Sequence, residues 1–238
     1  MKEIKLEHKW EKSIDKAIIK NGSMSLDGFE RSWKIYFQYF FEYYLKKIKD
    51  INLKSSVLDV GCGSGVISKE LARLGFEAYG VDFSKEVVKV ARRYAPTVDF
   101  QRSPIYKLPF PNESFDVVVC LGVLQTVADP SRAIKEMART LKKDGVLIIR
   151  TLNTFAISSF RGKNSPIFTF YSPLQLKKIL SKEGFKNISI KGIYICPKFL
   201  EVFTRIILWS KIYRWLNVIF FPIFIFLSHS FYIDGVKK

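Results

Sequence analysis

The sequence has few of the residues that mark disulfide-stabilised, zinc-binding or secreted proteins. Its three cysteines are Cys62, Cys120 and Cys196, and no two of them form a Cys-x-x-Cys pair. Such an odd and sparse set excludes a disulfide framework and gives no zinc pattern, so we expect no metal. The first residues, MKEIKLEHKWEK, are charged throughout and lack the apolar core of a signal peptide. A reducing, cytoplasmic setting is therefore expected.

Histidine and acidic residues are also scarce. The only histidines are His8 and His229, and we expect both to be structural or surface residues. The chain carries 39 Lys and Arg against 22 Asp and Glu, a formal net charge of +17. Residues 151–238 hold 13 basic and 3 acidic side chains, so the excess lies in the last third. This charge favours an anionic partner, namely a membrane surface, a nucleic acid or an acidic substrate, unless it only reflects a basic proteome.

The chain is long enough for one domain with a sizeable core, and its pattern changes near residue 55. In residues 1–54 apolar side chains recur at helical spacing, so we expect an N-terminal helical cap. Residues 55–238 alternate short apolar runs with helical segments, which is typical of a mostly parallel sheet with helices on both faces. The sequence therefore predicts an α/β, doubly wound sheet for this part.

Apolar runs and turn residues give approximate bounds for the elements of that sheet. The expected strands are residues 57–60, 78–81, 98–101, 115–121, 146–151, 187–195 and 231–236. The expected helices are residues 65–74, 85–94, 130–141 and a last one that Ser172-Pro173 opens and that ends at Gly184. The last two strands form a pair that is split by an insertion.

That insertion, residues 198–230, is apolar and has helical periodicity. No Asp, Glu, Lys or Arg occurs from Trp215 to Ile233, a length near the lower limit for a membrane span. However, Asn217 and Pro222 interrupt the run, and a span would carry the last strand across the membrane. We therefore expect an apolar helical insertion. It is either a flap over the ligand crevice, with peripheral contact to an anionic membrane, or part of the core.

The clearest motif is Val57-Leu-Asp-Val-Gly-Cys-Gly-Ser-Gly65, in which a strand runs into three glycines and then a helix. Glycines allow a tight turn and let a ligand press against the main chain, and the helix N-terminus presents free amides to it. The Gly-x-Gly-x-Gly spacing differs from the dinucleotide pattern Gly-x-Gly-x-x-Gly, and Asp59 lies two residues before the first glycine. A carboxylate there favours a ligand with ammonium or sulfonium charge over a phosphate.

A second candidate lies at the end of the next strand, in Tyr79-Gly-Val-Asp-Phe-Ser84. Asp82 follows Gly65 by seventeen residues and can accept both hydroxyls of a ribose. A strand-terminal Asp often caps the next helix, but Ser84 directly precedes Lys85 and is the better cap. We therefore expect Ser84 to cap the helix and Asp82 to be free for the ligand.

These motifs, together with Leu108-Pro-Phe-Pro-Asn-Glu-Ser-Phe-Asp-Val-Val119, resemble those of class I S-adenosylmethionine-dependent methyltransferases. The sequence is most similar to the branch that includes the ubiquinone and menaquinone biosynthesis methyltransferases, over about residues 55–196. The resemblance implies a seven-stranded, mostly parallel, Rossmann-like sheet in a domain of residues 55–238. It also implies S-adenosylmethionine as the cofactor.

The resemblance assigns cofactor-binding roles to both motifs. It implies that the methionine portion lies against the glycine motif, at Gly61, Cys62, Gly63 and Gly65. Asp59 would lie near the ammonium group of the cofactor. Asp82 would accept hydrogen bonds from the ribose hydroxyls, and Phe83 would lie beside the adenine.

The resemblance also implies contacts at two later strand ends. Pro104 and Ile105 stand where relatives have an acidic residue and a small residue that contact adenine. The acid is missing here, which leaves the backbone of Ile105 for the adenine contact. Leu121 and Gly122, at the end of the fourth strand, would face the transferring methyl group.

The usual general base is also missing. Gln125 and Thr126 stand where relatives often have an acidic residue and a His, and they are the remaining catalytic candidates. Either alignment of nucleophile, methyl and sulfur is enough, or a tyrosine or acid from the N-terminal helices supplies the base. We prefer alignment, because a sulfonium is already a strong methyl donor. We expect Asp116 to mark a strand edge rather than to act as a catalytic acid.

The preferred hypothesis is an enzyme that transfers a methyl group to a small lipophilic acceptor, such as a quinone precursor, an isoprenoid or a lipid, by direct displacement. A sugar or nucleotide-sugar acceptor, a tRNA acceptor on the basic surface, and a cofactor-binding fold without catalysis are the alternatives. Leu121-Gly-Val-Leu124 stands in place of the Asn/Asp-Pro-Pro-Tyr/Phe motif of many nucleobase amine methyltransferases, so we do not expect nucleic acid. The acceptor atom and the oligomeric state stay open.

Overall fold

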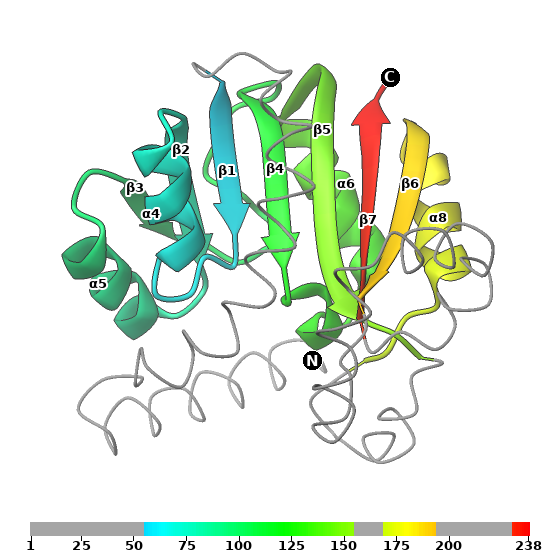
Figure 1. Cartoon of the computed structure of the whole chain (residues 1–238), viewed down its shortest axis with the longest axis horizontal. Coiled ribbons are helices and arrows are strands. Elements are labelled where there is room, and N and C mark those ends of the chain that lie inside the picture. The colour runs from blue at the N-terminus through cyan, green and yellow to red at the C-terminus, as the bar shows by residue number, and fades with distance from the viewer. Residues whose placement is uncertain (1–54, 155–168, 194–229) are drawn as a thin grey trace, which may run out of the picture.

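The computed structural model describes residues 55–154, 169–193 and 230–238, which form a sheet between two layers of helices (Figure 1). The predicted N-terminal cap lies outside the described residues, and so does the insertion up to residue 229. In the described part, the sheet has seven strands in the order β3-β2-β1-β4-β5-β7-β6. The strands are β1 Ser56–Val60, β2 Glu77–Asp82, β3 Asp99–Arg102, β4 Phe115–Leu121, β5 Leu141–Leu152, β6 Phe185–Ile193 and β7 Ser230–Lys237.

The directions of the strands confirm the predicted fold class. β1 pairs in parallel with β2 and β4, β2 with β3, and β4 with β5. β7 is antiparallel to both β5 and β6. The sheet is therefore mostly parallel and Rossmann-like, and the final strand pair forms as expected.

The helices lie close to their predicted positions. They are α4 Val66–Arg73, α5 Lys85–Tyr94, α6 Pro130–Thr140 and α8 Pro173–Lys182, and the structure adds a short 3-10 helix that was not predicted, η2 Leu124–Thr126. α4 begins one residue later than predicted because Gly65, with φ +81°, is its left-handed N-cap. α6 ends one residue earlier than predicted because Leu141 is already extended and pairs with Phe115 of β4.

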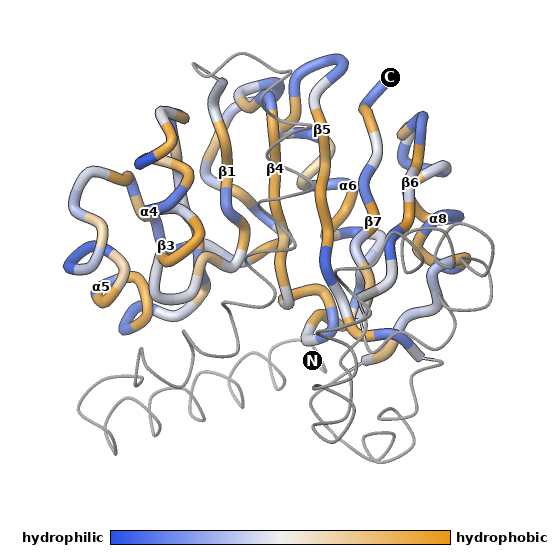
Figure 2. The backbone as a smooth tube through the Cα atoms, viewed as in Figure 1, coloured by the Kyte–Doolittle hydropathy of each residue, from blue (hydrophilic) through white to orange (hydrophobic). Residues whose placement is uncertain are grey.

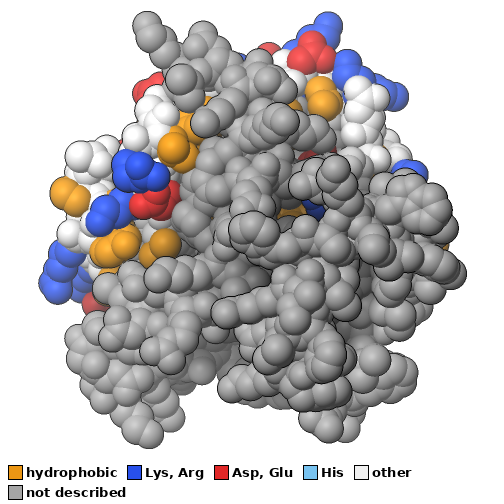
Figure 3. All heavy atoms as spheres, in the orientation of Figure 1, with side chains coloured by type: hydrophobic (Ala, Val, Ile, Leu, Met, Phe, Trp, Pro, Cys, Tyr) orange, Lys and Arg blue, Asp and Glu red, His pale blue; other side chains and the backbone are white. Residues whose placement is uncertain are grey.

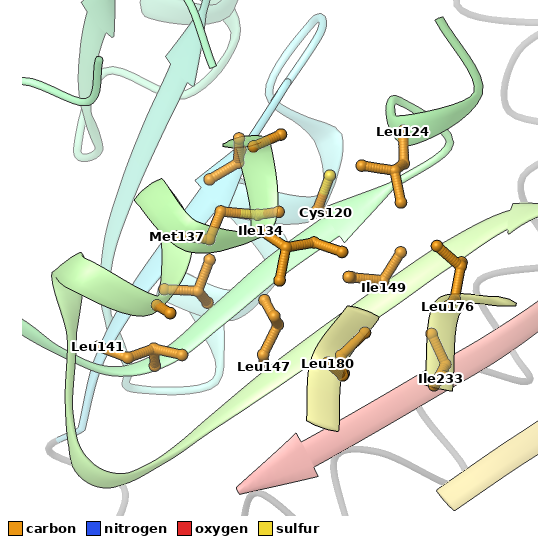
Figure 4. Close-up of a cluster of buried hydrophobic side chains, with 14 of the residues drawn as sticks. Cys120, Leu124, Ile134, Met137, Leu141, Leu147, Ile149, Leu176, Leu180 and Ile233 are labelled. Atoms are coloured by element: carbon orange, nitrogen blue, oxygen red, sulfur yellow. The ribbon is translucent and has the colours of Figure 1, made fainter. Parts of the chain in front are cut away.

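Two hydrophobic clusters hold the helices against opposite faces of the sheet. Alternate residues of a strand point to opposite faces. Ile148 of β5 accordingly lies in the cluster under α4 and α5, and its neighbours Leu147 and Ile149 lie in the cluster under α6 and α8. Figure 4 shows Leu147 and Ile149 beside Ile134 and Met137 of α6. Each such buried side chain contributes about 1.5–3 kcal/mol to folding, and the sheet is thereby fixed between its helices.

The amino-terminal edge of the sheet carries a structural carboxylate. Asp116 accepts hydrogen bonds from the backbone N–H of Ser56 at 2.8 Å and from its hydroxyl at 2.9 Å. It also pairs with Lys142 at 2.9 Å. Burial raises the pKa of Asp116, but Lys142 and Ser56 outweigh it and hold that pKa below its ordinary value. Asp116 therefore connects the starts of β1, β4 and β5, in agreement with the prediction of a role at a strand edge.

The opposite edge is where a ligand is expected. The carboxyl ends of β1 to β5 meet there, at the lower edge in Figure 1, and open α/β sheets bind ligands outside those ends. Figure 2 shows hydrophobic residues along β4 and a hydrophilic stretch near the carboxyl end of β5. A hydrophilic stretch thus lies at the edge of the sheet where a ligand is expected.

The exposed surface around α4 and α5 mixes both signs of charge. Figure 3 shows Lys and Arg side chains there with Asp or Glu side chains between them. Arg73 pairs with Glu70 at 2.7 Å, and Lys89 pairs with Glu86 at 2.8 Å. This surface is therefore not of a single sign. None of the helices in the described ranges is long and apolar enough to cross a membrane.

Candidate functional site

The glycine motif folds over the end of the neighbouring strand. The backbone N–H groups of Gly61 and Cys62 both donate to the carbonyl oxygen of Val81, at 2.7 and 2.9 Å. The loop after β1 is thereby fixed to the carboxyl end of β2. This contact brings the two predicted cofactor motifs together at one corner of the sheet.

Asp82 lies at the centre of this corner. One of its carboxylate oxygens accepts the backbone N–H of Gly63 at 3.1 Å, and the other accepts that of Ser84 at 3.0 Å. Ser84 caps α5, as predicted, because its hydroxyl oxygen accepts the N–H of Val87 at 3.3 Å. The prediction that Asp82 is free is wrong, since both oxygens already accept amides. Each oxygen keeps a second lone pair for another donor. Burial raises the pKa of Asp82, against these amide hydrogen bonds.

Asp59 is a second carboxylate at the same corner, and it is 2% exposed. Its pKa is raised to about 7: burial is the largest cause, the Ser68 hydroxyl opposes it by donating to the carboxylate at 2.7 Å, and the charge of Asp82 adds to it. Ser68, in α4, was not predicted, and its position nine residues after Asp59 gives no recognisable spacing. Two neighbouring carboxylates that resist ionisation favour a cationic ligand, which stabilises their charged forms.

The glycines of the motif serve different purposes. A Cβ at Gly61 would collide with Val123, and one at Gly65 would come within 2.8 Å of the Phe100 ring. These two glycines are therefore needed for packing. Gly63 has φ +54°, and no non-neighbouring atom of the described residues lies within 4 Å of the position of its Cβ. Its open side allows a ligand to approach the main chain.

Cys62 offers no reactive thiol. The residue is 7% exposed, and burial together with the charges of Asp59 and Asp82 raises its pKa well above the ordinary value. A protonated thiol is a poor nucleophile. Its contribution to the loop is therefore its backbone N–H and its packing.

The predicted adenine residues follow the ends of β2 and β3. Arg102 donates to the carbonyl oxygen of Phe83 at 2.9 Å, and the N–H of Ser103 donates to that of Asp82 at 2.9 Å. These contacts hold the loop after β3 beside the loop after β2. Pro104 is exposed, and Ile105 is half-buried against the cluster under α6. Phe83 thus lies in one of two joined loops and Pro104 and Ile105 in the other, and their contact with adenine stays a prediction.

The segment after β4 carries the predicted methyl-transfer residues. Leu121 is 6% exposed and belongs to the cluster under α4 and α5. Gly122, with φ +82°, donates its N–H to the carbonyl oxygen of Arg150 at 2.9 Å. Gln125 is buried, and its side-chain oxygen accepts the Thr151 hydroxyl at 3.4 Å. This chain turn is therefore closely fixed to the end of β5.

Neither catalytic candidate is arranged as a general base. The Thr126 hydroxyl donates to the carbonyl oxygen of Val123 at 2.7 Å, within its own turn. The Gln125 amide has no basic nitrogen, and its backbone carbonyl accepts the N–H of Thr169 at 2.6 Å. Both residues shape the turn, an arrangement that is compatible with transfer by alignment.

Sequence reasoning missed Arg150 at this edge. Its guanidinium lies 3.4 Å from the place of a Cβ on Gly122 and donates to the Ser230 hydroxyl at 3.5 Å. Arg150 is only 8% exposed. The sequence did contain a signal for it. Arg150 is a charged residue that directly follows the apolar run Val146–Ile149 inside the predicted strand.

The central part of the chain matches a known protein family. The family described as "Methyltransferase domain" matches residues 58–149. A ubiquinone biosynthesis O-methyltransferase of Coxiella burnetii is 37% identical over 167 residues, which cover 63% of this chain and 71% of that protein. One of Xanthomonas oryzae pv. oryzae is 41% identical over 102 residues, covering 41% and 43%.

A third relative, of Mycobacterium tuberculosis, is named as a probable S-adenosylmethionine-dependent methyltransferase. It is 29% identical over 153 residues, covering 63% of this chain and 55% of that protein. The chain thus spans about half the length of several relatives that it matches.

Solved structures share the fold. A SAM-dependent methyltransferase from Archaeoglobus fulgidus has a TM-score of 0.60 at 19% identity, covering 85% of this chain and 99% of that one. A phosphoethanolamine N-methyltransferase of Haemonchus contortus, in complex with S-adenosyl-L-methionine, has a TM-score of 0.58 at 20% identity, covering 78% and 49%. At these identities the likeness shows a common fold.

Proposed function

This chain belongs to the S-adenosylmethionine-dependent methyltransferases, and we propose that it methylates a hydroxyl group of a small lipophilic acceptor, such as a quinone precursor. The cofactor of the family is S-adenosylmethionine. The observation that carries the proposal is the pair of carboxylates at the glycine loop, of which Asp59 is buried and Asp82 is half-buried. The relatives named as ubiquinone biosynthesis O-methyltransferases support an oxygen acceptor and a lipophilic one.

The residues of the corner fit this cofactor. A buried carboxylate whose pKa is raised to about 7 matches the ammonium group, and Asp59 would therefore hold it. Asp82 would accept the ribose hydroxyls with the lone pairs that Gly63 and Ser84 leave. The open side of Gly63 leaves room for the methionine portion.

The chain's own contribution to the reaction is to bind and orient the reactants. The bound cofactor supplies a methyl group that its positive sulfur already activates. Fixed carboxylates and loop amides would position that methyl group. Holding the two reactants in line lowers the entropic part of the activation barrier. The proton of the acceptor hydroxyl leaves to solvent, because neither Gln125 nor Thr126 can take it.

A label-transfer assay tests this function. The protein is incubated with methyl-labelled S-adenosylmethionine and a lysate of its own host, and the products are partitioned between organic solvent and water. We expect the label in the organic phase with the native chain and its loss with Asp82→Ala. Asp99→Ala is the matched control, because Asp99 is an exposed carboxylate at the amino end of β3, away from the carboxyl edge of the sheet. Label that stays in water, or that nuclease treatment releases, contradicts the proposal.

A further inference from the structure

A row of side chains crosses the sheet next to the methyl-transfer position. Leu121 of β4 pairs with Arg150 of β5, Arg150 pairs with Tyr232 of β7, and Tyr232 pairs with Lys191 of β6. Directly paired residues point to the same face, and Leu121 and Tyr232 both lie in the cluster under α4 and α5. Arg150 therefore points to the face that carries the glycine loop, one strand, or about 4.8 Å, beyond Leu121.

The guanidinium of Arg150 lies at the carboxyl edge of this row. One terminal nitrogen is 3.4 Å from the place of a Cβ on Gly122, and the other donates to Ser230 at 3.5 Å. The guanidinium therefore lies near the end of β4 and is hydrogen-bonded to the start of β7, two points that are far apart in the sequence. A group that reacts above Leu121 and Gly122 would come within reach of it.

The charged groups around Arg150 define what it can attract. In the described residues of this row, Arg150 and Lys191 are cationic, and Tyr232 is a phenol. Asp234 is a buried carboxylate on the same face, two residues further along β7 and away from the carboxyl edge. Among the described residues of this row, the side of Arg150 that faces Gly122 thus carries positive charge, and an arginine stays charged at any working pH.

We propose that Arg150 binds the reacting oxygen of the acceptor as a phenolate. This inference rests on the proposed function and specifies the acceptor as an aromatic hydroxyl. The oxygen attacks the methyl carbon, the carbon–sulfur bond breaks with its electron pair going to sulfur, and S-adenosylhomocysteine leaves. The hydroxyl proton has already passed to solvent, because a cation at hydrogen-bond distance lowers the pKa of a phenol by about one to three. Arg150 thereby replaces the missing general base.

The test uses the ionisation of 4-nitrocatechol, whose phenolate differs from its phenol in visible absorbance. The intact protein is saturated with S-adenosylhomocysteine, which carries no sulfonium charge, and the bound nitrocatechol is titrated with pH. We expect a phenolate-to-phenol ratio about tenfold or more above that of the free compound. Arg150→Gln should remove this difference, and Arg150→Lys should keep part of it, because it keeps the charge.

Lys142→Gln is the matched control, because it removes one positive charge from the amino end of the same strand, where Lys142 pairs with Asp116. It should behave as the native chain does. A native chain without the shift in ionisation overturns the inference, and so does a folded Arg150→Gln variant that keeps it. If Arg150→Gln does not fold, Arg150→Lys decides: a ratio as low as that of the free compound overturns the inference, because this variant keeps the charge.

Two further measurements distinguish phenolate binding from carboxylate binding and from a failure of the cofactor site. A loss of affinity of Arg150→Gln for 3,4-dihydroxybenzoate alone, with nitrocatechol unaffected, would place a carboxylate at Arg150 and overturn the inference. Binding of S-adenosylmethionine itself is measured in parallel. Its failure in the native chain would contradict the proposed function, whereas intact cofactor binding without the phenolate effect would contradict only the role of Arg150.

Discussion

The backbone N–H of Gly63 donates a hydrogen bond to a carboxylate oxygen of Asp82 across 3.1 Å, and so joins the loop after β1 to the end of β2. The other oxygen is held by the N–H of Ser84 at 3.0 Å. Both oxygens therefore have a fixed orientation before a ribose arrives. Such pre-organisation reduces the entropy that binding must otherwise overcome.

Gly63→Ala should separate stability from cofactor binding. The added Cβ meets no atom of the described part of the chain within 4 Å, so its cost in folding is the strain of φ +54°, about 1–2 kcal/mol. The methyl group would stand where we place the methionine portion, and calorimetry should show S-adenosylmethionine binding at least about tenfold weaker, about 1.4 kcal/mol. Gly184→Ala is the control, because Gly184 has φ +87°, equal open space and no place in the site. Equal cofactor affinity in the two variants would remove Gly63 from the site.

Asp59 should make cofactor binding depend on pH. Its pKa is raised to about 7 by burial, so its carboxylate charges as the pH rises from about 6 to about 8. The charged form attracts the ammonium group, and affinity for S-adenosylmethionine should increase over that range. Asp59→Asn should bind more weakly and lose this increase. A pH profile of Asp59→Asn that matches the native one would exclude the proposed ammonium contact.

The same residue should affect stability with the opposite sign. The unfolded chain ionises Asp59 near its ordinary value of 3.8, whereas the folded chain keeps it protonated to about 7. The folded state therefore holds more protons between these values, and the free energy of unfolding falls as pH rises through this window. Denaturant unfolding of the chain without ligand should show Asp59→Asn gaining stability over the native chain from pH 4 to pH 7.

Ser68→Ala should move the pH profile of binding upward. The Ser68 hydroxyl lowers the pKa of Asp59 by donating to its carboxylate at 2.7 Å. Without it the carboxylate ionises at higher pH, and affinity for S-adenosylmethionine at pH 7 should drop while affinity at high pH recovers. Calorimetric titrations across pH measure this. A uniform loss of affinity at every pH would indicate damage to α4 instead of a change in Asp59.

Much of this fold could be predicted from local sequence patterns. The bounds of α5 agree because Ser84 is a strong cap, and those of β4 agree because the run Phe115–Leu121 is apolar and bounded by turn residues. β5 is predicted from residue 146 but begins at Leu141. Its first residue, Leu141, pairs with Phe115 of β4. The polar residues 142–144 separate Leu141 from the apolar run, so the sequence pattern does not reveal this pairing.

The same difference between local patterns and contacts of distant residues holds for the site. The place of Asp59 beside the glycines is predictable because one short loop contains them all, and their roles toward the cofactor stay a prediction. The partners of Asp82 are not, because the Gly63 amide comes from nineteen residues away and is brought close only by the pairing of β1 with β2. Arg150 acquires its neighbours Gly122 and Ser230 through strand pairing alone, and no local pattern contains that information.

Asp116→Asn should affect stability and leave the cofactor site unchanged. Lys142 and Ser56 hold the pKa of Asp116 below its ordinary value, so the ionised carboxylate stabilises the fold above its unfolded pKa. That stabilisation is lost as the pH falls through the lower, folded pKa. At pH 7 we expect a loss of up to about 1 kcal/mol for this partly exposed pair. Thermal unfolding measures it, and weaker cofactor binding in this variant would contradict a purely structural role.

The most direct test of the cofactor site is the calorimetric titration of S-adenosylmethionine into the native chain, Asp82→Ala and Asp99→Ala. We predict saturable binding of one cofactor per native chain and unchanged binding to Asp99→Ala. Asp82→Ala should bind at least about tenfold more weakly, because two hydrogen bonds to a charged acceptor are lost. A native chain that binds no cofactor, or Asp82→Ala that binds as tightly as the native chain, would contradict the proposed site.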